Sequence, residues 1–150
     1  MLMRQVMDVM SLCEGPRIRE KEIRNFFLGK GASPDEIETT AITGKGGSTL
    51  FIKLRLRGSP AVGGIEPAPP LGIIGRLGGI GARPHAVGLV SDADGAICAL
   101  SAASELAEAR KRGDGGTGDV IIATHLCPDA PVTPHDPVPF MGAPPFPWMS

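Results

Sequence analysis

Two short apolar runs each lead into side chains that can bind a metal ion or carry a proton. The runs are residues 86–90 and 120–123, and a helix-like stretch, residues 96–112, lies between them. The polar residues that follow the two runs are Asp92, Asp94, His125, Cys127 and Asp129. A strand, a helix and a parallel strand bring the carboxyl ends of both strands to one edge of a sheet, where open α/β folds bind ligands. The spacing therefore predicts one site built from both clusters.

Imidazole and carboxylate groups are usual ligands of zinc, and they recur in the irregular stretch after the second run. The predicted ligands of a divalent metal ion such as zinc are Asp92, Asp94, His125, Asp129 and His135. We expect Asp92, Asp94 and His125 also to be the catalytic residues. Aspartate is a favoured helix N-cap, so one of the two aspartates is expected to serve only that purpose. The absence of a Cys-x-x-Cys pair argues against a zinc finger.

A glycine-rich segment, residues 75–81, resembles a nucleotide-binding loop only superficially. It matches neither Gly-x-Gly-x-x-Gly nor the phosphate loop, and Pro84 follows before a helix can begin. The glycine turn at residues 44–47 leads into a strand and is not a phosphate loop either. We therefore expect close packing at these glycines. Arg76 and Arg83 are predicted ligand-binding residues, because a guanidinium can hold a carboxylate through two hydrogen bonds.

Composition limits the possible partners of the chain. Its 150 residues include 15 Lys and Arg against 16 Asp and Glu, so the formal net charge is −1 and no basic stripe predicts a nucleic-acid partner. No apolar run approaches the ~20 residues that a membrane helix needs. Three widely spaced cysteines fit a reducing compartment. These features predict a cytoplasmic protein with no nucleic-acid and no membrane partner.

Hydrophobic periodicity predicts an α/β fold with a mostly parallel sheet and flanking helices. The predicted elements are helices at 2–13 and 17–28, a hairpin of 36–43 and 49–57, strands at 71–74, 87–90 and 120–123, and a helix at 96–112. The last three strands are apolar on both faces, as parallel strands covered on both sides usually are.

One incomplete α/β domain is predicted over residues 1–143. Its parts are the helices and hairpin (1–57), a loop (58–70) and a β-β-α-β core (71–127). Residues 128–150 form a proline-rich tail that cannot be a helix or a central strand. A chain that stops in such a tail, with few large side chains to close a core, is expected to be truncated.

Several segments of the chain resemble the bacterial family catalogued as domain of unknown function 1177. They are residues 4–6, 15–17, 45–49, 71–84, 88–95, 118–131 and 134–142. The resemblance covers about residues 1–143. Members of that family are about twice as long, so the resemblance implies that this chain is the amino-terminal half. The family has no established activity.

The order of strand, Asp-rich turn, helix and strand distantly resembles the core of zinc-dependent exopeptidases and aminoacylases. That resemblance implies metal-dependent hydrolysis of an amide bond in a small amino-acid-like or peptide-like ligand, with Asp92 or Asp94 as the bridging ligand. The His-x-Asp motif of those enzymes would fall at residues 76–78, which carry neither residue, and the Glu-Glu pair would fall near 125–129, which has no glutamate. The alternatives are a binding or accessory protein that lost the metal site, or an inactive truncated fragment.

Overall fold

A computed structural model describes residues 2–14, 18–44, 47–59, 66, 68–76, 93–128, 132–133, 136–137 and 140–141. Its elements, in chain order, are α1 (Leu2–Cys13), α2 (Glu20–Lys30), η1 (Pro34–Glu36), β1 (Ile37–Gly44), β2 (Gly47–Leu56), β3 (Leu71–Ile74), α3 (Asp94–Lys111), β4 (Val120–Leu126), β5 (Val132–Thr133) and β6 (Phe140–Met141). The predicted helices, the hairpin and the strands at 71–74 and 120–123 are confirmed, with small shifts at their ends. The predicted strand at 87–90 lies outside the described residues.

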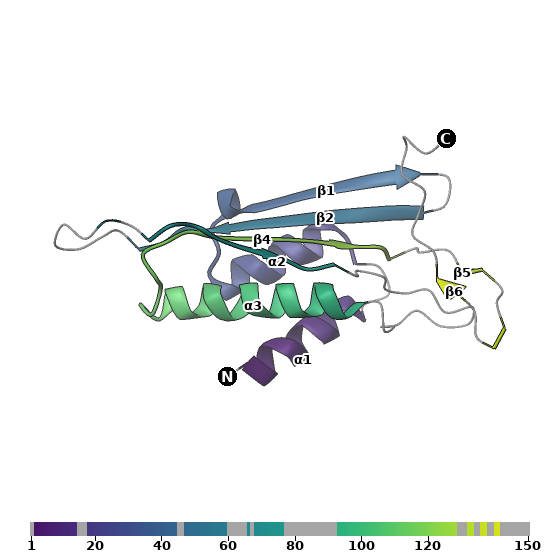
Figure 1. The fold of residues 1–150 in the computed structure, drawn as a ribbon, viewed down its shortest axis with the longest axis horizontal. Helices are drawn as coiled ribbons and strands as arrows, with labels where there is room; N and C mark the ends of the chain where they lie inside the picture. Colours follow the sequence, from purple (N-terminus) through teal and green to yellow (C-terminus); the bar gives the residue numbers. More distant parts are fainter. Residues whose placement is uncertain are drawn as a thin grey trace.

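The main sheet is mixed and has the strand order β1-β2-β4-β3 (Figure 1). β1 pairs with β2 and β2 pairs with β4 in antiparallel fashion, and only β3 and β4 are parallel. The α/β class is confirmed, but the prediction of a mostly parallel sheet is wrong. The physical reason is that the hairpin joins the sheet through β2. The apolar run of β4 is typical of a strand covered on both faces, as in parallel sheets. Ile121 and Ala123, on its outer face, are only partly buried, so β4 is not fully covered on that face.

Alternation along β2 separates the two faces of the sheet. Four alternate residues of β2 are buried: Leu50, Ile52, Leu54 and Leu56. Lys53 and Arg55 between them are exposed, as expected for a strand with one covered face. α2 and α3 cover the buried face (Figure 1), and Ile23, Phe27 and Leu100 from these helices join the same hydrophobic cluster. The opposite face of the sheet is therefore the one that carries the polar residues of β2.

α1 packs against α3 and is fixed there by polar contacts to one carboxylate. Glu108 of α3 accepts hydrogen bonds from Arg4 at 2.6 Å, from Gln5 at 2.6 Å and from Lys30 of α2 at 2.9 Å. Val9 of α1 is fully buried. The three helices are thus held together by both apolar and ionic contacts. No helix of the described residues is long and apolar enough to cross a membrane.

The carboxylate of Glu36 joins the far ends of four elements. Its side chain is 2% exposed and forms a two-pronged pair with the guanidinium of Arg110, near the end of α3. The backbone N–H groups of Ser33 and Arg57 donate to its two oxygens at 2.8 and 2.9 Å. Arg110 also donates to the carbonyl of Gly31 at 3.1 Å. The end of α2, η1, the end of β2 and the end of α3 therefore meet at one satisfied ion pair.

Glu36→Gln is expected to lower the free energy of unfolding at pH 7 by about 3 kcal/mol, because it leaves the partly buried Arg110 without its counter-charge. Burial alone would raise the pKa of Glu36, but the hydrogen bonds from Arg110, Ser33 and Arg57 outweigh it and hold that pKa below its ordinary value. The stability from this group is therefore present above the ordinary carboxyl pKa and is lost as the pH falls through the lowered one. Urea denaturation between pH 3 and pH 7 measures both effects.

Lys53→Gln serves as the control, because the Lys53–Glu38 ion pair is exposed on both sides and such pairs contribute little. A loss below about 0.5 kcal/mol for Glu36→Gln, the range of ordinary surface substitutions, would contradict the role assigned to this ion pair.

Candidate functional site

The carboxyl ends of the parallel strands β3 and β4 lie side by side, which places the residues that follow them in one region. Ile74 pairs with Ala123, and the pairing continues beyond β3 because Gly75 N–H donates to the carbonyl of Ala123 at 2.9 Å. The Thr124 hydroxyl donates to the carbonyl of Gly75 at 3.0 Å. Arg76 is next in this register and therefore lies at the level of His125. These two predicted site residues come together at the edge where α/β folds bind ligands.

His125 lies on the outer face of the sheet, opposite Phe51 of β2. The centroids of the two rings are 6.1 Å apart and their planes are inclined by 40°. Partial burial, and then the positive charge of Arg76, lower the pKa of His125 below its ordinary value of 6.5. At neutral pH the imidazole is therefore neutral, so one ring nitrogen donates a hydrogen bond and the other can accept a proton.

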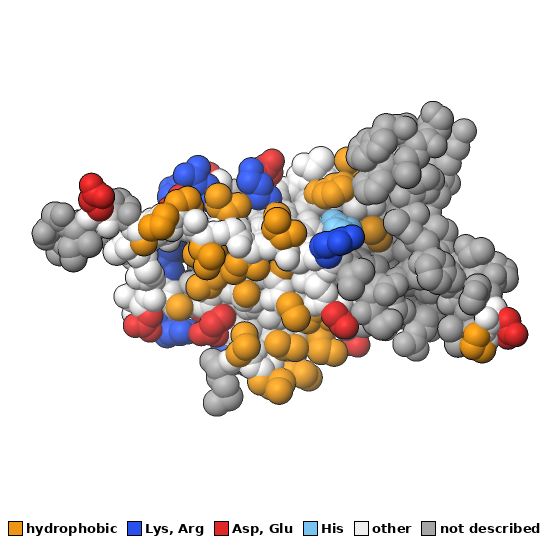
Figure 2. All heavy atoms as spheres, viewed as in Figure 1, with side chains coloured by type: hydrophobic (Ala, Val, Ile, Leu, Met, Phe, Trp, Pro, Cys, Tyr) orange, Lys and Arg blue, Asp and Glu red, His pale blue; other side chains and the backbone are white. Residues whose placement is uncertain are grey.

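Arg76 is exposed, and its charge acts on His125. Figure 2 shows a histidine side chain at the surface with a basic side chain against it. Among the described residues, the guanidinium of Arg76 has no hydrogen-bond or ion-pair partner. A planar guanidinium without a partner is suited to two parallel hydrogen bonds with a ligand carboxylate.

Two glycines bring the start of α3 against the end of β3. A Cβ atom at Gly95 would overlap the carbonyl oxygen of Arg76, and one at Gly75 would overlap the carbonyl oxygen of Gly95 and lie 2.7 Å from the Cβ of Ala99. The expectation of close packing at the glycine-rich segment is thus confirmed at Gly75. Asp94, the first residue of α3, is exposed beside this crossing. The aspartate therefore lies at the same end of the sheet as Arg76.

Asp94 is not the N-cap of α3. That position belongs to Ala93, which is buried and whose side chain makes no capping hydrogen bond. The carboxylate of Asp94 in the first turn still interacts favourably with the positive end of the helix dipole. Asp92, the other predicted N-cap candidate, lies outside the described residues.

The predicted metal site is described only in part. Asp94 and His125 are described, whereas the predicted ligands Asp92, Asp129 and His135 lie outside the described residues, as does Arg83, which was predicted to bind the organic ligand. Within the described ranges, no three His, Cys, Asp or Glu side chains lie close enough together to hold a metal ion. Asp94 and His125 alone therefore do not form the three-ligand set typical of a catalytic zinc centre.

Cys127 directly follows β4 at this end of the sheet. Its thiol is buried and lies 3.5 Å from the hydroxyl of Thr49. Burial raises the pKa of Cys127, and the contact with Thr49 offsets this only in part. A thiol that stays protonated is a poor nucleophile.

Phe51 is the neighbour of His125 that sequence patterns did not identify. The alternation along β2 places Phe51 on the outer face, but it does not show which strand lies beside β2 or in which register. Only the pairing of β2 with β4 reveals the contact between the two rings.

Comparison with known proteins gives a family. A family model described as "Protein of unknown function (DUF1177)" matches residues 40–146, more than half of the chain. The match includes β2, β3, α3 and β4, and so it contains Arg76, Asp94 and His125. No curated protein matches the chain.

Arg76→Gln is expected to raise the pKa of His125 while leaving it below 6.5, because the substitution removes the repulsion by Arg76 but not the burial. NMR titration of the imidazole Cε1 proton between pH 4 and pH 8 measures the change. The control, Lys53→Gln, removes a positive charge from the same face of the sheet and is expected to leave the His125 pKa nearly unchanged. Equal shifts in the two variants would contradict a specific contact between Arg76 and His125.

Proposed function

From the geometry of its site, we propose a function for this chain, which belongs to the family of proteins of unknown function DUF1177. The protein binds a small amino-acid-like or peptide-like ligand at the carboxyl ends of β3 and β4. The observation that carries this proposal is the position of Arg76 beside a neutral His125, with no hydrogen-bond or ion-pair partner for the guanidinium among the described residues.

The carboxylate of the ligand is assigned to Arg76. The guanidinium stays charged throughout the physiological pH range, and its parallel N–H groups match the two oxygens of a carboxylate. Arg76 is exposed, so a ligand displaces only water and breaks no ion pair within the described chain. The positive end of α3 lies against the backbone of Arg76 and also favours an anion there.

The other groups at this end of the sheet suit the rest of an amino-acid-like molecule. The neutral ring of His125 can donate to or accept from an amide, and Phe51 supplies an apolar surface beside it. The exposed carboxylate of Asp94 can pair with an ammonium group. A molecule that carries both a carboxylate and an amine or amide therefore matches the described charges.

Arg76→Gln is expected to weaken the binding of N-acetyl-L-leucine at least tenfold, because charged hydrogen bonds contribute about 1.5–3 kcal/mol. N-acetyl-L-leucine is a probe that carries a carboxylate, an amide and an apolar side chain. Titration of the ¹⁵N-labelled full chain measures its affinity. The control is Lys53→Gln, which changes the net charge equally and is expected to leave the affinity within about twofold.

Two outcomes would contradict the binding proposal. One is an absence of shifts at residues 74–76, 94–95 and 125 on addition of the probe. The other is equal weakening by Arg76→Gln and Lys53→Gln, which would indicate general electrostatic attraction.

Hydrolysis of the amide is a second candidate function, and the neutral state of His125 favours it. In this reaction His125 accepts a proton from water, the oxygen of that water attacks the amide carbon, and the proton goes to the leaving nitrogen as the C–N bond breaks. A divalent ion, if held by the other predicted ligands, Asp92, Asp94, Asp129 and His135, would lower the pKa of the attacking water and leave His125 as the base. Carboxylate and imidazole groups are usual zinc ligands. That these residues meet at one ion is part of this proposal.

Under this second candidate, the full chain is expected to release L-leucine from N-acetyl-L-leucine, and His125→Ala is expected to abolish the release while Cys127→Ser retains it. The free amine is measured with o-phthalaldehyde after treatment with a chelator, before and after addition of about one equivalent of Zn²⁺. Release no faster than in buffer under both conditions would contradict hydrolysis and leave the binding function as the proposal.

A further inference from the structure

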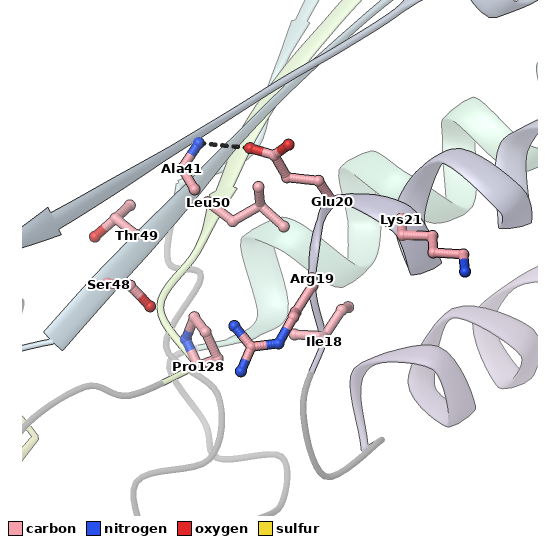
Figure 3. A pocket seen from close by; sticks show the side chains of 9 residues that line it. All are labelled: Ile18, Arg19, Glu20, Lys21, Ala41, Ser48, Thr49, Leu50 and Pro128. Atoms are coloured by element: carbon pink, nitrogen blue, oxygen red, sulfur yellow. Dashed lines mark hydrogen bonds between the residues drawn. The ribbon is translucent and has the colours of Figure 1, made fainter.

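We propose that the chain has a second ligand site, a pocket between the start of α2 and the start of β2, which binds a small monocarboxylate with an apolar body. The pocket has a volume of about 360 Å³, within the range of small-molecule sites, roughly 300–1,000 Å³. It is lined by Ile18, Arg19, Glu20, Lys21, Ala41, Ser48, Thr49, Leu50 and Pro128 (Figure 3). Nothing in the family description assigns a ligand here.

This pocket is separate from the site at His125. Leu50, in its wall, belongs to the face of β2 that is buried against the helices. Phe51, the next residue, points to the opposite face and contacts His125. The two sites therefore lie on different faces of the sheet, and the second does not depend on the function proposed for the first.

The body of the pocket is apolar. Ile18 and Leu50 are buried at 4% exposure each, and Pro128 closes the wall that follows β4. Ala41 of β1, whose side chain occupies little volume, also lines the pocket. An apolar group of a ligand would thus be removed from water on several sides, which contributes about 25 cal/mol per Å² of buried apolar surface.

Arg19 gives the pocket its preference for an anion. Figure 3 shows the Arg19 guanidinium directed across the pocket toward Pro128, while the ammonium of Lys21 points away. The guanidinium has no hydrogen-bond or ion-pair partner among the described residues. The one carboxylate in the lining, Glu20, accepts a hydrogen bond from Ala41 N–H at 2.9 Å and is held against the edge of β1. The cation is therefore available to a ligand.

The surroundings of Arg19 agree with this preference. Arg19 is the N-cap residue of α2, whose positive end faces the pocket, although Glu20 and Glu22 in the first turn offset part of that field. Ser48 and Thr49 also line the pocket (Figure 3), but the Thr49 hydroxyl is directed away from it, to the thiol of Cys127. One guanidinium beside an apolar cavity matches a ligand with one carboxylate and a hydrocarbon body better than a bare or multiply charged anion.

The test uses 3-phenylpropionate as the probe and ¹H–¹⁵N chemical shifts of the full chain as the readout. We expect shifts at residues 18–21, 41, 48–50 and 127. The neutral analogue 3-phenylpropanamide is expected to bind at least tenfold more weakly, because it cannot form the charged pair with Arg19. Inorganic phosphate, which lacks an apolar body, is expected to bind more weakly than 3-phenylpropionate as well.

Arg19→Gln is expected to weaken the binding of 3-phenylpropionate at least tenfold. Lys21→Gln is the matched control: it removes the same charge from the same turn of α2, its ammonium points away from the pocket, and the affinity is expected to stay within about twofold. Ala41→Leu adds bulk to the lining and keeps the N–H that Glu20 binds, so it is expected to abolish binding without loss of fold. Thermal unfolding verifies that each variant is folded.

Three results would overturn the proposal. Equal weakening by Arg19→Gln and Lys21→Gln would show general attraction of anions. Unchanged binding in folded Ala41→Leu would place the probe outside the pocket. Phosphate that binds as tightly as 3-phenylpropionate would show that the apolar walls contribute nothing.

Discussion

The ion pair between Glu36 and Arg110 fixes the end of the fold that lies away from both sites. Four donors from three segments converge on one buried carboxylate: two from Arg110 and one each from the backbone of Ser33 and Arg57. A buried carboxylate with all these partners is stabilised in its charged form, whereas any one partner alone would leave a costly charge in the core. The ends of α2, β2 and α3 are therefore held at one point. The direction in which each element runs from that point determines which residues lie together at the opposite end of the fold.

At the opposite end, the described residues are organised by contact between backbones. Gly75 and Gly95 let β3 and α3 approach until no Cβ atom would fit between them. This approach brings the positive end of α3 to Arg76, and the hydrogen bond from Gly75 to Ala123 sets Arg76 beside His125. The geometry of the candidate site thus follows from main-chain packing, which leaves its side chains available to a ligand.

Sequence patterns identified most elements because hydrophobic periodicity is a local property. The helix at 2–13, the alternating strand of the hairpin and the strand at 120–123 are all visible within a few residues. Strand pairing is not local, and this is why the sheet was wrongly expected to be mostly parallel. The Glu36–Arg110 pair joins residues 74 positions apart, so neither partner stands out in the sequence. In the described sheet β3 is the parallel neighbour of β4, and this pairing brings Arg76 and His125 to one edge; the predicted strand at 87–90 lies outside the described residues.

The distribution of charge differs between the two ends of the described domain. Around Glu36 and Glu108, cations and carboxylates satisfy one another. At the other end, Arg19 precedes α2 and the backbone of Arg76 lies against the start of α3, and the guanidinium groups of both have no partner in the described chain. A guanidinium near the positive end of a helix experiences electrostatic repulsion, although the backbone N–H of Arg19 still donates to Glu22 in the first turn of α2. An anion near either would relieve that repulsion, and this is the physical reason to regard both positions as binding sites.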